Sequence, residues 1–152
     1  MLRKICDAYP KVMIAEGIDI SGAMVKQAKK ISKDYPITFC EGTLEDIDSE
    51  KQKYNVLLCM HSFHHYPKPL KVLKAMGKML CSEGRLIIVE NRLEGWERWR
   101  SNLYFFKARY HSGDLWIYSK YELTFLAKLA GFKKVGYKKC GDQSFMLVCQ
   151  II

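Results

Sequence analysis

The chain has 152 residues, of which 49% are hydrophobic and 27% are charged, and its formal net charge is +9 at pH 7. This length suits one domain with a sizeable core, and no apolar stretch approaches the ~20 residues that a membrane span needs. The six cysteines occur singly and no signal-peptide core is seen. These features argue against a secreted disulfide scaffold, and we expect reduced thiols in a cytoplasmic protein.

Eight of the 25 lysine and arginine residues lie in two lysine stripes. In each stripe, lysines recur at helical spacing opposite the apolar residues. They are Lys26, Lys29, Lys30 and Lys33 in one stretch, and Lys68, Lys71, Lys74 and Lys78 in another. Such stripes are more often solvated outer faces than binding sites. The charge therefore permits nucleic-acid binding without favouring it.

Helix and strand alternate from the start of the chain. Apolar residues at helical spacing predict a short amphipathic helix that Pro10 ends, and Val12–Asp19 is predicted as a buried strand. A helix over Gly22–Ser32, capped by Ser21, and a short strand over Ile37–Cys40 follow. The residues that we expect to face inward on this helix are Met24, Ala28 and Ile31.

The middle of the chain continues the alternation. Tyr54–Met60 is an almost unbroken apolar run, typical of a strand in a parallel sheet that is covered on both faces. Pro69–Cys81 has helical periodicity, and Arg85–Glu90 predicts another buried strand after the turn at Gly84. The inward residues of the helix would be Leu70, Leu73, Met76, Met79 and Leu80.

The C-terminal part is predicted to end in a β-hairpin. Ser119 and Glu122 have the spacing of a capping box at the start of a helix that Gly131 ends. Strands near Lys133–Lys139 and Ser144–Ile151 are close enough in sequence to pair antiparallel. The whole pattern predicts an α/β fold, a Rossmann-like doubly wound sheet that is mostly parallel and ends in an antiparallel hairpin.

Polar residues stand at the carboxyl ends of the predicted strands, where such sheets bind their ligands. Asp19 ends the first of them, Glu41–Thr43 follows the short strand, and His61 and Glu90 stand at the ends of two later ones. In nucleotide-binding α/β sheets, an acidic residue between the end of a strand and the start of the next helix commonly holds the two hydroxyl groups of a ribose. This edge of the sheet is therefore the predicted ligand site.

Four stretches, in this order, resemble one family. They are Gly17–Lys29, Asn55–Pro67, Leu73–Ile88 and Phe125–Phe132. They resemble the second-strand motif, the fourth-strand motif, the helix with the fifth strand, and the late Ala-Gly-Phe corner of class I S-adenosylmethionine-dependent methyltransferases. The likeness is greatest to the small-molecule and quinone-biosynthesis type. It implies S-adenosylmethionine as cofactor and methyl transfer to a small or medium, hydrophobic small-molecule acceptor.

The resemblance assigns the cofactor contacts that follow the first two predicted strands. Asp19 would accept hydrogen bonds from both ribose hydroxyls, and Ile20 and Met24 would flank the adenine. The alternative role of Asp19 is that of an acid favoured at a helix N-terminus. After the second strand the family usually has an acidic partner for the adenine amino group, and this chain has a threonine in that place. The candidate adenine contacts there are Thr43, Leu44, Glu45 and Asp46.

A histidine cluster follows the apolar strand in the middle of the chain. By resemblance His61 lies over the cofactor, and His64 or His65 stands at the mouth of the acceptor pocket, where a neutral imidazole could orient or deprotonate the acceptor. The alternative is that both cap the turn before Pro67. The spacing of these histidines and Cys59 fits no zinc motif and a fourth ligand is missing, so no metal site is predicted.

An aromatic segment, predicted as an insert over about residues 93–118, follows the strand that ends at Glu90. Its apolar side chains step by three and four along one helix: Trp96, Trp99, Leu103, Phe106 and Tyr110. One interpretation is a helix that packs this seam on the core. Another is a lid over the acceptor, because inserts at this place in related methyltransferases commonly cover the substrate. Basic residues beside the aromatics could instead serve single-stranded nucleic acid.

The resemblance also implies a first strand and a Gly-x-Gly turn ahead of the first helix, and neither is found in the sequence. We expect residues 1–152 to form one N-terminally incomplete methyltransferase-like domain that binds the cofactor weakly and could be an inactive fragment. Strand edges left unpaired could support self-association. The alternative function is a non-catalytic binding or assembly module of the same fold that binds RNA through its basic surface.

Overall fold

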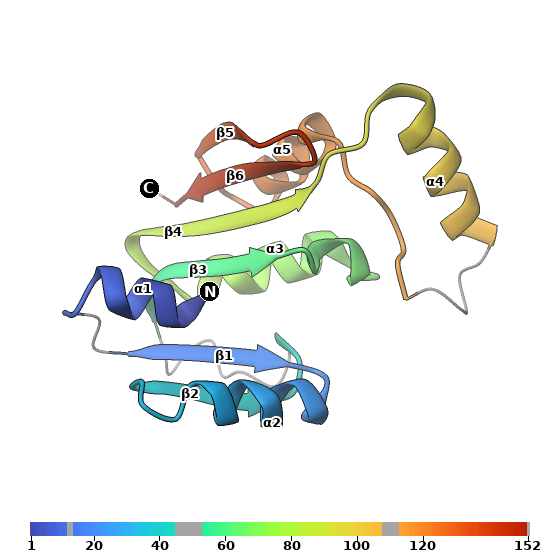
Figure 1. Ribbon diagram of the computed structural model, residues 1–152. Coiled ribbons are helices and arrows are strands. Elements are labelled where there is room, and N and C mark those ends of the chain that lie inside the picture. The colour runs from blue at the N-terminus through green and yellow to red at the C-terminus, as the bar shows by residue number, and fades with distance from the viewer. Residues whose placement is uncertain (12–13, 45–52, 108–112, 152) are drawn as a thin grey trace. The chain divides into compact units, whose positions relative to one another are not determined.

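The computed structural model describes residues 1–11, 14–44, 53–107 and 113–151. The chain forms two compact units, Met1–Asp48 and Ser49–Ile152 (Figure 1). None of the described helices is long and apolar enough to cross a membrane.

The first unit is a parallel strand pair with two helices. Its elements are α1 (Leu2–Ala8), β1 (Ala15–Asp19), α2 (Gly22–Ile31) and β2 (Ile37–Glu41). β1 and β2 are parallel, and their register places Asp19 opposite Glu41 at the carboxyl ends. The Ser21 side chain caps α2 by accepting a hydrogen bond from the amide of Met24 at 3.4 Å. The predicted order of elements is confirmed in this unit.

The inward face predicted for α2 is wrong. Met24 and Ile31 are exposed, and Val25 is the buried residue of the helix. Val25 lies next to the predicted inward residues on the helix surface, so helical spacing alone does not distinguish them. A two-stranded sheet also offers too little surface to cover a wide apolar stripe. Apolar side chains therefore remain exposed beside Asp19.

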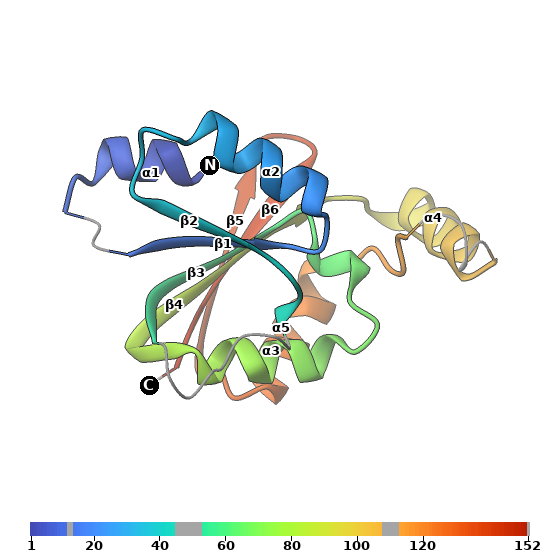
Figure 2. The same cartoon turned by 90° about the horizontal axis from the view of Figure 1, so that it is seen from below.

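The second unit is a four-stranded sheet with helices. Its elements are β3 (Tyr54–Met60), the 3₁₀-helix η2 (Phe63–His65), α3 (Pro69–Lys78), β4 (Leu80–Asn91), α4 (Gly95–Lys107), α5 (Lys120–Leu129), β5 (Lys134–Cys140) and β6 (Ser144–Gln150). The strand order is β3-β4-β6-β5, with β3 and β4 parallel and the other pairs antiparallel. α3 and α5 lie on one face of this sheet (Figure 2). The predicted sheet, mostly parallel with an antiparallel C-terminal hairpin, is confirmed, since β6 alone of these four strands runs antiparallel to the others.

The predicted boundary between α3 and β4 is wrong. α3 ends at Lys78, and Leu80 already pairs with Tyr54 in the sheet. The apolar sequence pattern extends past the end of α3 because Met79 and Leu80, which lie after the helix, are also buried. Gly84 allows the irregular start of β4, since a Cβ there would lie 2.8 Å from the carbonyl oxygen of Cys81.

Alternation along the two inner strands builds the core of the second unit. In β4, Leu86 and Ile88 are fully buried, and in β6, Leu147 and Cys149 are fully buried. Side chains alternate between the faces of a strand with period two, so Glu90 falls on the same buried side as Ile88. The polar end of β4 is thus held inside the protein.

The predicted self-association depends on strand edges that have no partner strand. Within the described ranges, β1 pairs only with β2, and β3 only with β4. Self-association through these edges stays a prediction.

Candidate functional site

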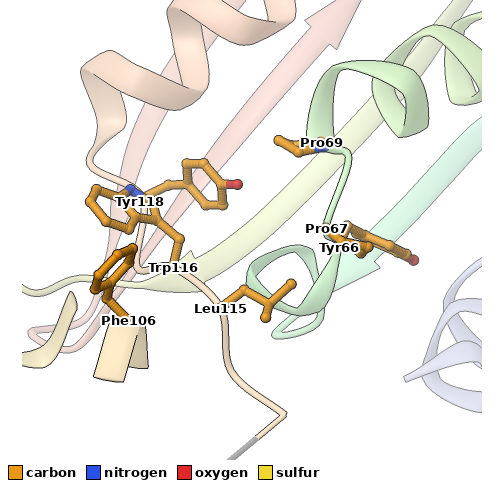
Figure 3. Close-up of a pocket in the computed structure, with 7 residues that line it drawn as sticks. All are labelled: Tyr66, Pro67, Pro69, Phe106, Leu115, Trp116 and Tyr118. Atoms are coloured by element: carbon orange, nitrogen blue, oxygen red, sulfur yellow. The ribbon is translucent and has the colours of Figure 1, made fainter. Parts of the chain in front are cut away.

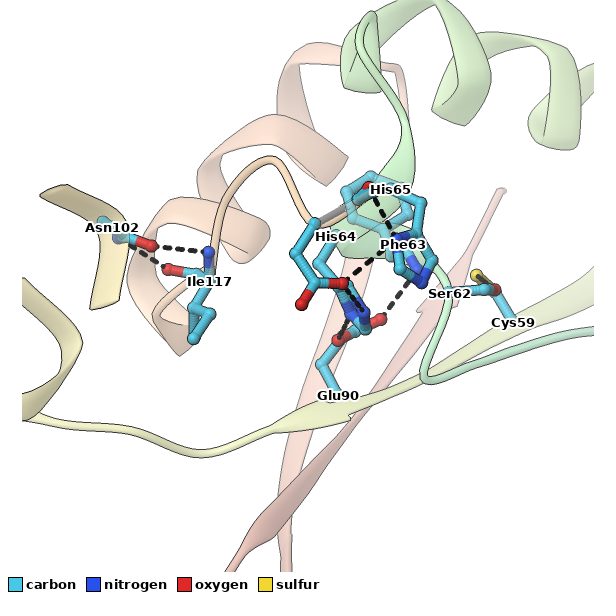
Figure 4. Close-up of polar contacts among 10 residues, drawn as sticks. Cys59, Ser62, Phe63, His64, His65, Glu90, Asn102 and Ile117 are labelled. Atoms are coloured by element: carbon cyan, nitrogen blue, oxygen red, sulfur yellow. Dashed lines mark hydrogen bonds and ion pairs between the residues drawn. The ribbon is translucent and has the colours of Figure 1, made fainter. Parts of the chain in front are cut away.

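The site in the second unit starts from the buried carboxylate of Glu90. Its Oε1 accepts a hydrogen bond from the backbone amide of Phe63 at 2.7 Å, and its Oε2 lies 2.7 Å from Nδ1 of His64 (Figure 4). The Glu90 side chain is 4% exposed and that of His64 12% exposed. A carboxylate can only accept, so Nδ1 of His64 carries the proton of this bond and the ring is held in one orientation.

The pair shifts the proton affinities of both partners. The hydrogen bond with Glu90 raises the pKa of His64 above its ordinary value, although burial of the ring opposes the shift. Burial alone would raise the pKa of Glu90. The hydrogen bond with His64, its charge, and the amides of Phe63 and Asn91 instead lower this pKa below its usual range. A charged His64–Glu90 pair is therefore favoured.

A second acid, Asp114, approaches the same histidines from a segment far along the chain. Its Oδ1 lies 3.4 Å from Nε2 of His64 and 3.3 Å from Nδ1 of His65. The same Nδ1 of His65 is 2.9 Å from the carbonyl oxygen of Gly113. Both ring nitrogens of His64 and Nδ1 of His65 are thus engaged away from the turn, and the role of the two histidines stays a prediction. His64, His65 and Asp114 are the described residues placed to hold a metal ion.

An apolar hollow of about 280 Å³ lies in the same unit; none of its lining residues is a histidine, but the amide of one of them, Leu115, donates to the carbonyl oxygen of His64 at 3.0 Å. Tyr66 and Pro67 line it from the connection between η2 and α3, and Pro69 lines it from the start of α3 (Figure 3). The other lining residues, from α4 and the segment after it, are Phe106, Leu115, Trp116 and Tyr118. Burial raises the pKa of Tyr118 to about 12, so its phenol stays neutral. The hollow therefore suits an uncharged, apolar molecule.

The aromatic seam of α4 does not pack on the core. Trp96, Trp99 and Phe106 are more than half exposed, while Tyr110 lies outside the described residues. The core interpretation of this seam is wrong. Helical periodicity identifies one face of α4 but cannot say what that face contacts.

α4 is instead attached to the chain through its polar side. Buried Asn102 donates to the carbonyl oxygen of Ile117 at 3.1 Å and accepts from its amide at 2.7 Å. Arg98 binds Glu122 at 2.7 Å, in the confirmed capping box of Ser119. These contacts hold in place the segment that carries Trp116 and Tyr118 of the hollow.

The predicted cofactor residues of the first unit stand around the start of α2. Oδ1 of Asp19 accepts from the amide of Ser21 at 2.8 Å, so the helix-terminus role of this acid remains an alternative. Ile20 and Met24 beside it are 76% and 58% exposed. The carboxylate of Glu41, which sequence analysis left without a role, lies so close to Gly22 that a Cβ on Gly22 would overlap it.

The other residues predicted to contact the cofactor lie after β2 and after β3. Thr43 and Leu44 follow β2, and Glu45 and Asp46 lie outside the described residues. His61 follows β3 in the second unit, in a left-handed backbone conformation with φ of 45°, and its amide donates to the carbonyl oxygen of Val89 at 2.8 Å. The cofactor roles of these residues stay predictions.

A comparison with protein families shows the family of the chain. The profile of the family described as "Methyltransferase domain" matches residues 4–88, more than half of the chain. The chain belongs to this methyltransferase family. The matched stretch contains Asp19, the histidine cluster and most of β4. No curated protein matches the chain significantly.

Solved structures agree on the fold of this methyltransferase. The PH0226 protein of Pyrococcus horikoshii OT3 is 20% identical with a TM-score of 0.73, covering 99% of this chain and 76% of its own. N-methyltransferase NodS of Bradyrhizobium japonicum WM9 is 12% identical with a TM-score of 0.70. The match covers 95% of this chain and 77% of NodS. PigF, solved with SAH, is 20% identical with a TM-score of 0.74. The match covers 99% of this chain and 46% of PigF.

The resemblance to class I S-adenosylmethionine-dependent methyltransferases is therefore confirmed. S-adenosylmethionine is the cofactor of this family, and the reaction class is methyl transfer.

Proposed function

We propose that this protein transfers the methyl group of S-adenosylmethionine to a small or medium, hydrophobic acceptor whose reacting atom faces His64 and His65. The observation that carries the proposal is the oriented His64–Glu90 pair together with an apolar hollow whose lining residue Leu115 donates its amide to the carbonyl oxygen of His64. The hollow offers aromatic and proline surface to an acceptor body, and the pair offers a polar group to its reacting atom. Together they suit an apolar molecule with one nucleophilic polar atom.

His64 is the better placed of the two candidate catalytic histidines. Its Nδ1 donates to Glu90, so the charged ring becomes a base by losing its Nε2 proton, and in the neutral ring that results the lone pair is on Nε2. Nε2 can orient the acceptor and take the proton that its nucleophilic atom loses, and buried Glu90 stabilises the imidazolium that results. His65, half exposed beside it, is the second candidate. When bound, S-adenosylmethionine supplies an electrophilic methyl group on a sulfonium, and the sulfur keeps the bonding electrons.

The cofactor contacts follow the family resemblance. Asp19 holds the ribose hydroxyls, and Ile20 and Met24 flank the adenine. The exposure of these two apolar side chains beside a strand-end carboxylate supports this assignment, because a flat base would cover them. The other proposed contacts are Thr43 and Leu44, near the adenine, and His61.

Transfer of labelled methyl groups to a panel of acceptors tests this function. The protein is incubated with methyl-tritiated S-adenosylmethionine and with small phenols, aromatic amines, a zwitterionic amino acid or an RNA oligonucleotide. We expect label in the apolar phenols or amines, and a rate reduced about 100-fold or more in His64→Ala. Label in RNA with none in the small molecules would contradict the proposal and favour the basic surface as the binding site.

A further inference from the structure

Three potential metal ligands converge in the second unit. They are Nε2 of His64, a ring nitrogen of His65 and a carboxylate oxygen of Asp114, and one ligand atom from each lies within 4.8 Å of the others. His64 and His65 come from η2, whereas Asp114 comes from the segment between α4 and α5. Folding of the second unit alone brings this set together.

The spacing of the ligand atoms fits a tetrahedral ion. Ligands about 2.0–2.1 Å from Zn²⁺ at tetrahedral angles lie about 3.3–3.4 Å from one another. Oδ1 of Asp114 lies 3.4 Å from Nε2 of His64 and 3.3 Å from Nδ1 of His65. Two edges of the coordination polyhedron thus already have the length that a bound ion requires.

A buried carboxylate orients the first of these ligands. Glu90 accepts from Nδ1 of His64 at 2.7 Å, which leaves Nε2, 3.4 Å from Oδ1 of Asp114, as the nitrogen that gives up its proton and binds the ion. Metal-binding histidines almost always donate their other ring proton to such a carboxylate or to a carbonyl group, and the partner fixes the tautomer. Nδ1 of His65, which faces Gly113 and Asp114 oxygens, would exchange its proton for the ion.

We infer that His64, His65 and Asp114 bind a divalent transition-metal ion, with Zn²⁺ as the preferred ion and water in the fourth position. Two imidazoles and one carboxylate form a ligand set that Zn²⁺ accepts readily. Sequence spacing predicted no metal site because the third protein ligand is remote in the chain. This inference does not rest on the proposed function.

Titration with Zn²⁺ alone tests the site. The protein, in a non-chelating reductant and without cofactor or acceptor, is titrated with zinc chloride by calorimetry. We expect one Zn²⁺ per chain, with affinity at least about 10-fold weaker in His65→Ala and in Asp114→Asn, and about 10–100-fold weaker in Glu90→Gln. Both ligand substitutions affect partly exposed side chains, so these variants should fold, as circular dichroism can verify.

His61→Ala is the matched control, because it removes a nearby histidine outside the ligand set. Its affinity for Zn²⁺ should equal that of the wild type. Co²⁺ provides a second readout, since the six cysteines could also bind metal. Four-coordinate Co²⁺ gives strong visible absorption, and a thiolate charge-transfer band would overturn the inference by placing the ion on cysteine. Binding unchanged in both ligand variants, or no binding at all, would also overturn it.

The ion and the acceptor would compete for Nε2 of His64. If both proposals hold, Zn²⁺ inhibits methyl transfer in the wild type and inhibits Asp114→Asn only at higher concentration. Failure of methyl transfer would leave the direct titration interpretable, so the two proposals fail separately.

Discussion

Glu90→Ala is expected to reduce both the stability of the protein and its methyl transfer. The carboxylate accepts from the amide of Phe63 and from Nδ1 of His64, each at 2.7 Å, in a nearly fully buried position. Alanine leaves a buried amide without its acceptor and a histidine without its charge partner. Such losses amount to roughly 2–4 kcal/mol of unfolding free energy. Urea unfolding followed by circular dichroism measures this change.

Glu90→Ala should reduce the rate of methyl transfer even in the fraction of the variant that is folded. Without Glu90, His64 can rotate or change tautomer, and the group that takes the acceptor proton is misplaced. We expect a rate about 100-fold lower than that of the wild type, at the lower end of the range for general base catalysis. Glu90→Gln, which keeps one acceptor for Phe63, should retain more stability than activity.

Glu94→Ala is the control for this substitution, since Glu94 is exposed and its ion pair with Arg92 is at the surface. Its unfolding free energy should change by less than about 0.5 kcal/mol. Equal stability of the Glu90 and Glu94 variants would show that the Glu90 carboxylate is not buried in a hydrogen-bonded pair.

Phe63→Ala is the substitution with the largest expected loss of stability. The Phe63 side chain is 0% exposed, and its ring packs edge-on against Tyr66 and Tyr118 at centroid distances of 5.8 and 5.3 Å. Removing a buried phenylalanine ring typically costs about 3–5 kcal/mol. Alanine keeps the backbone amide that binds Glu90, so the loss measures packing. Thermal and urea unfolding report it.

Trp99→Ala separates the core from the exposed seam of α4. Trp99 is 55% exposed, and its ring stacks on Trp96 at 4.9 Å. Its truncation should change the unfolding free energy by less than about 1 kcal/mol, near the range for surface sites. A loss similar to that of Phe63→Ala would mean that the seam is buried in the folded protein, against the structure.

The elements of the fold were largely predictable because local signals agreed with the final packing. The apolar run Tyr54–Met60 matches β3 residue for residue, and the Ser119–Glu122 capping box starts α5 as expected. The boundary after Lys78 was not predictable from periodicity. Met79 and Leu80 are buried although they lie past the end of the helix, so their apolar character carries no information on where the helix ends.

The candidate site was predictable in its residue types but not in its contacts. Strand-end position marked Glu90, yet nothing local links it to His64, which precedes it by 26 residues. Asp114 had no signal, since an isolated acid in a polar segment is ordinary. Asn102 gave only the weak signal of a polar residue within a helix, and its bonds to Ile117 depend on tertiary structure. Such pairings arise from the topology of the sheet.

The proposed cofactor site is tested most directly by calorimetric titration of S-adenosylmethionine into the wild type, Asp19→Asn and Asp19→Ala. If Asp19 holds the ribose, Asp19→Ala should bind about 10–100-fold more weakly than the wild type, the scale of charge-assisted hydrogen bonds, and Asp19→Asn should lie between them. The contrary result is equal affinity in all three proteins, with only a lower melting temperature in Asp19→Ala. That result would make Asp19 a helix-terminus acid and contradict the proposed cofactor site.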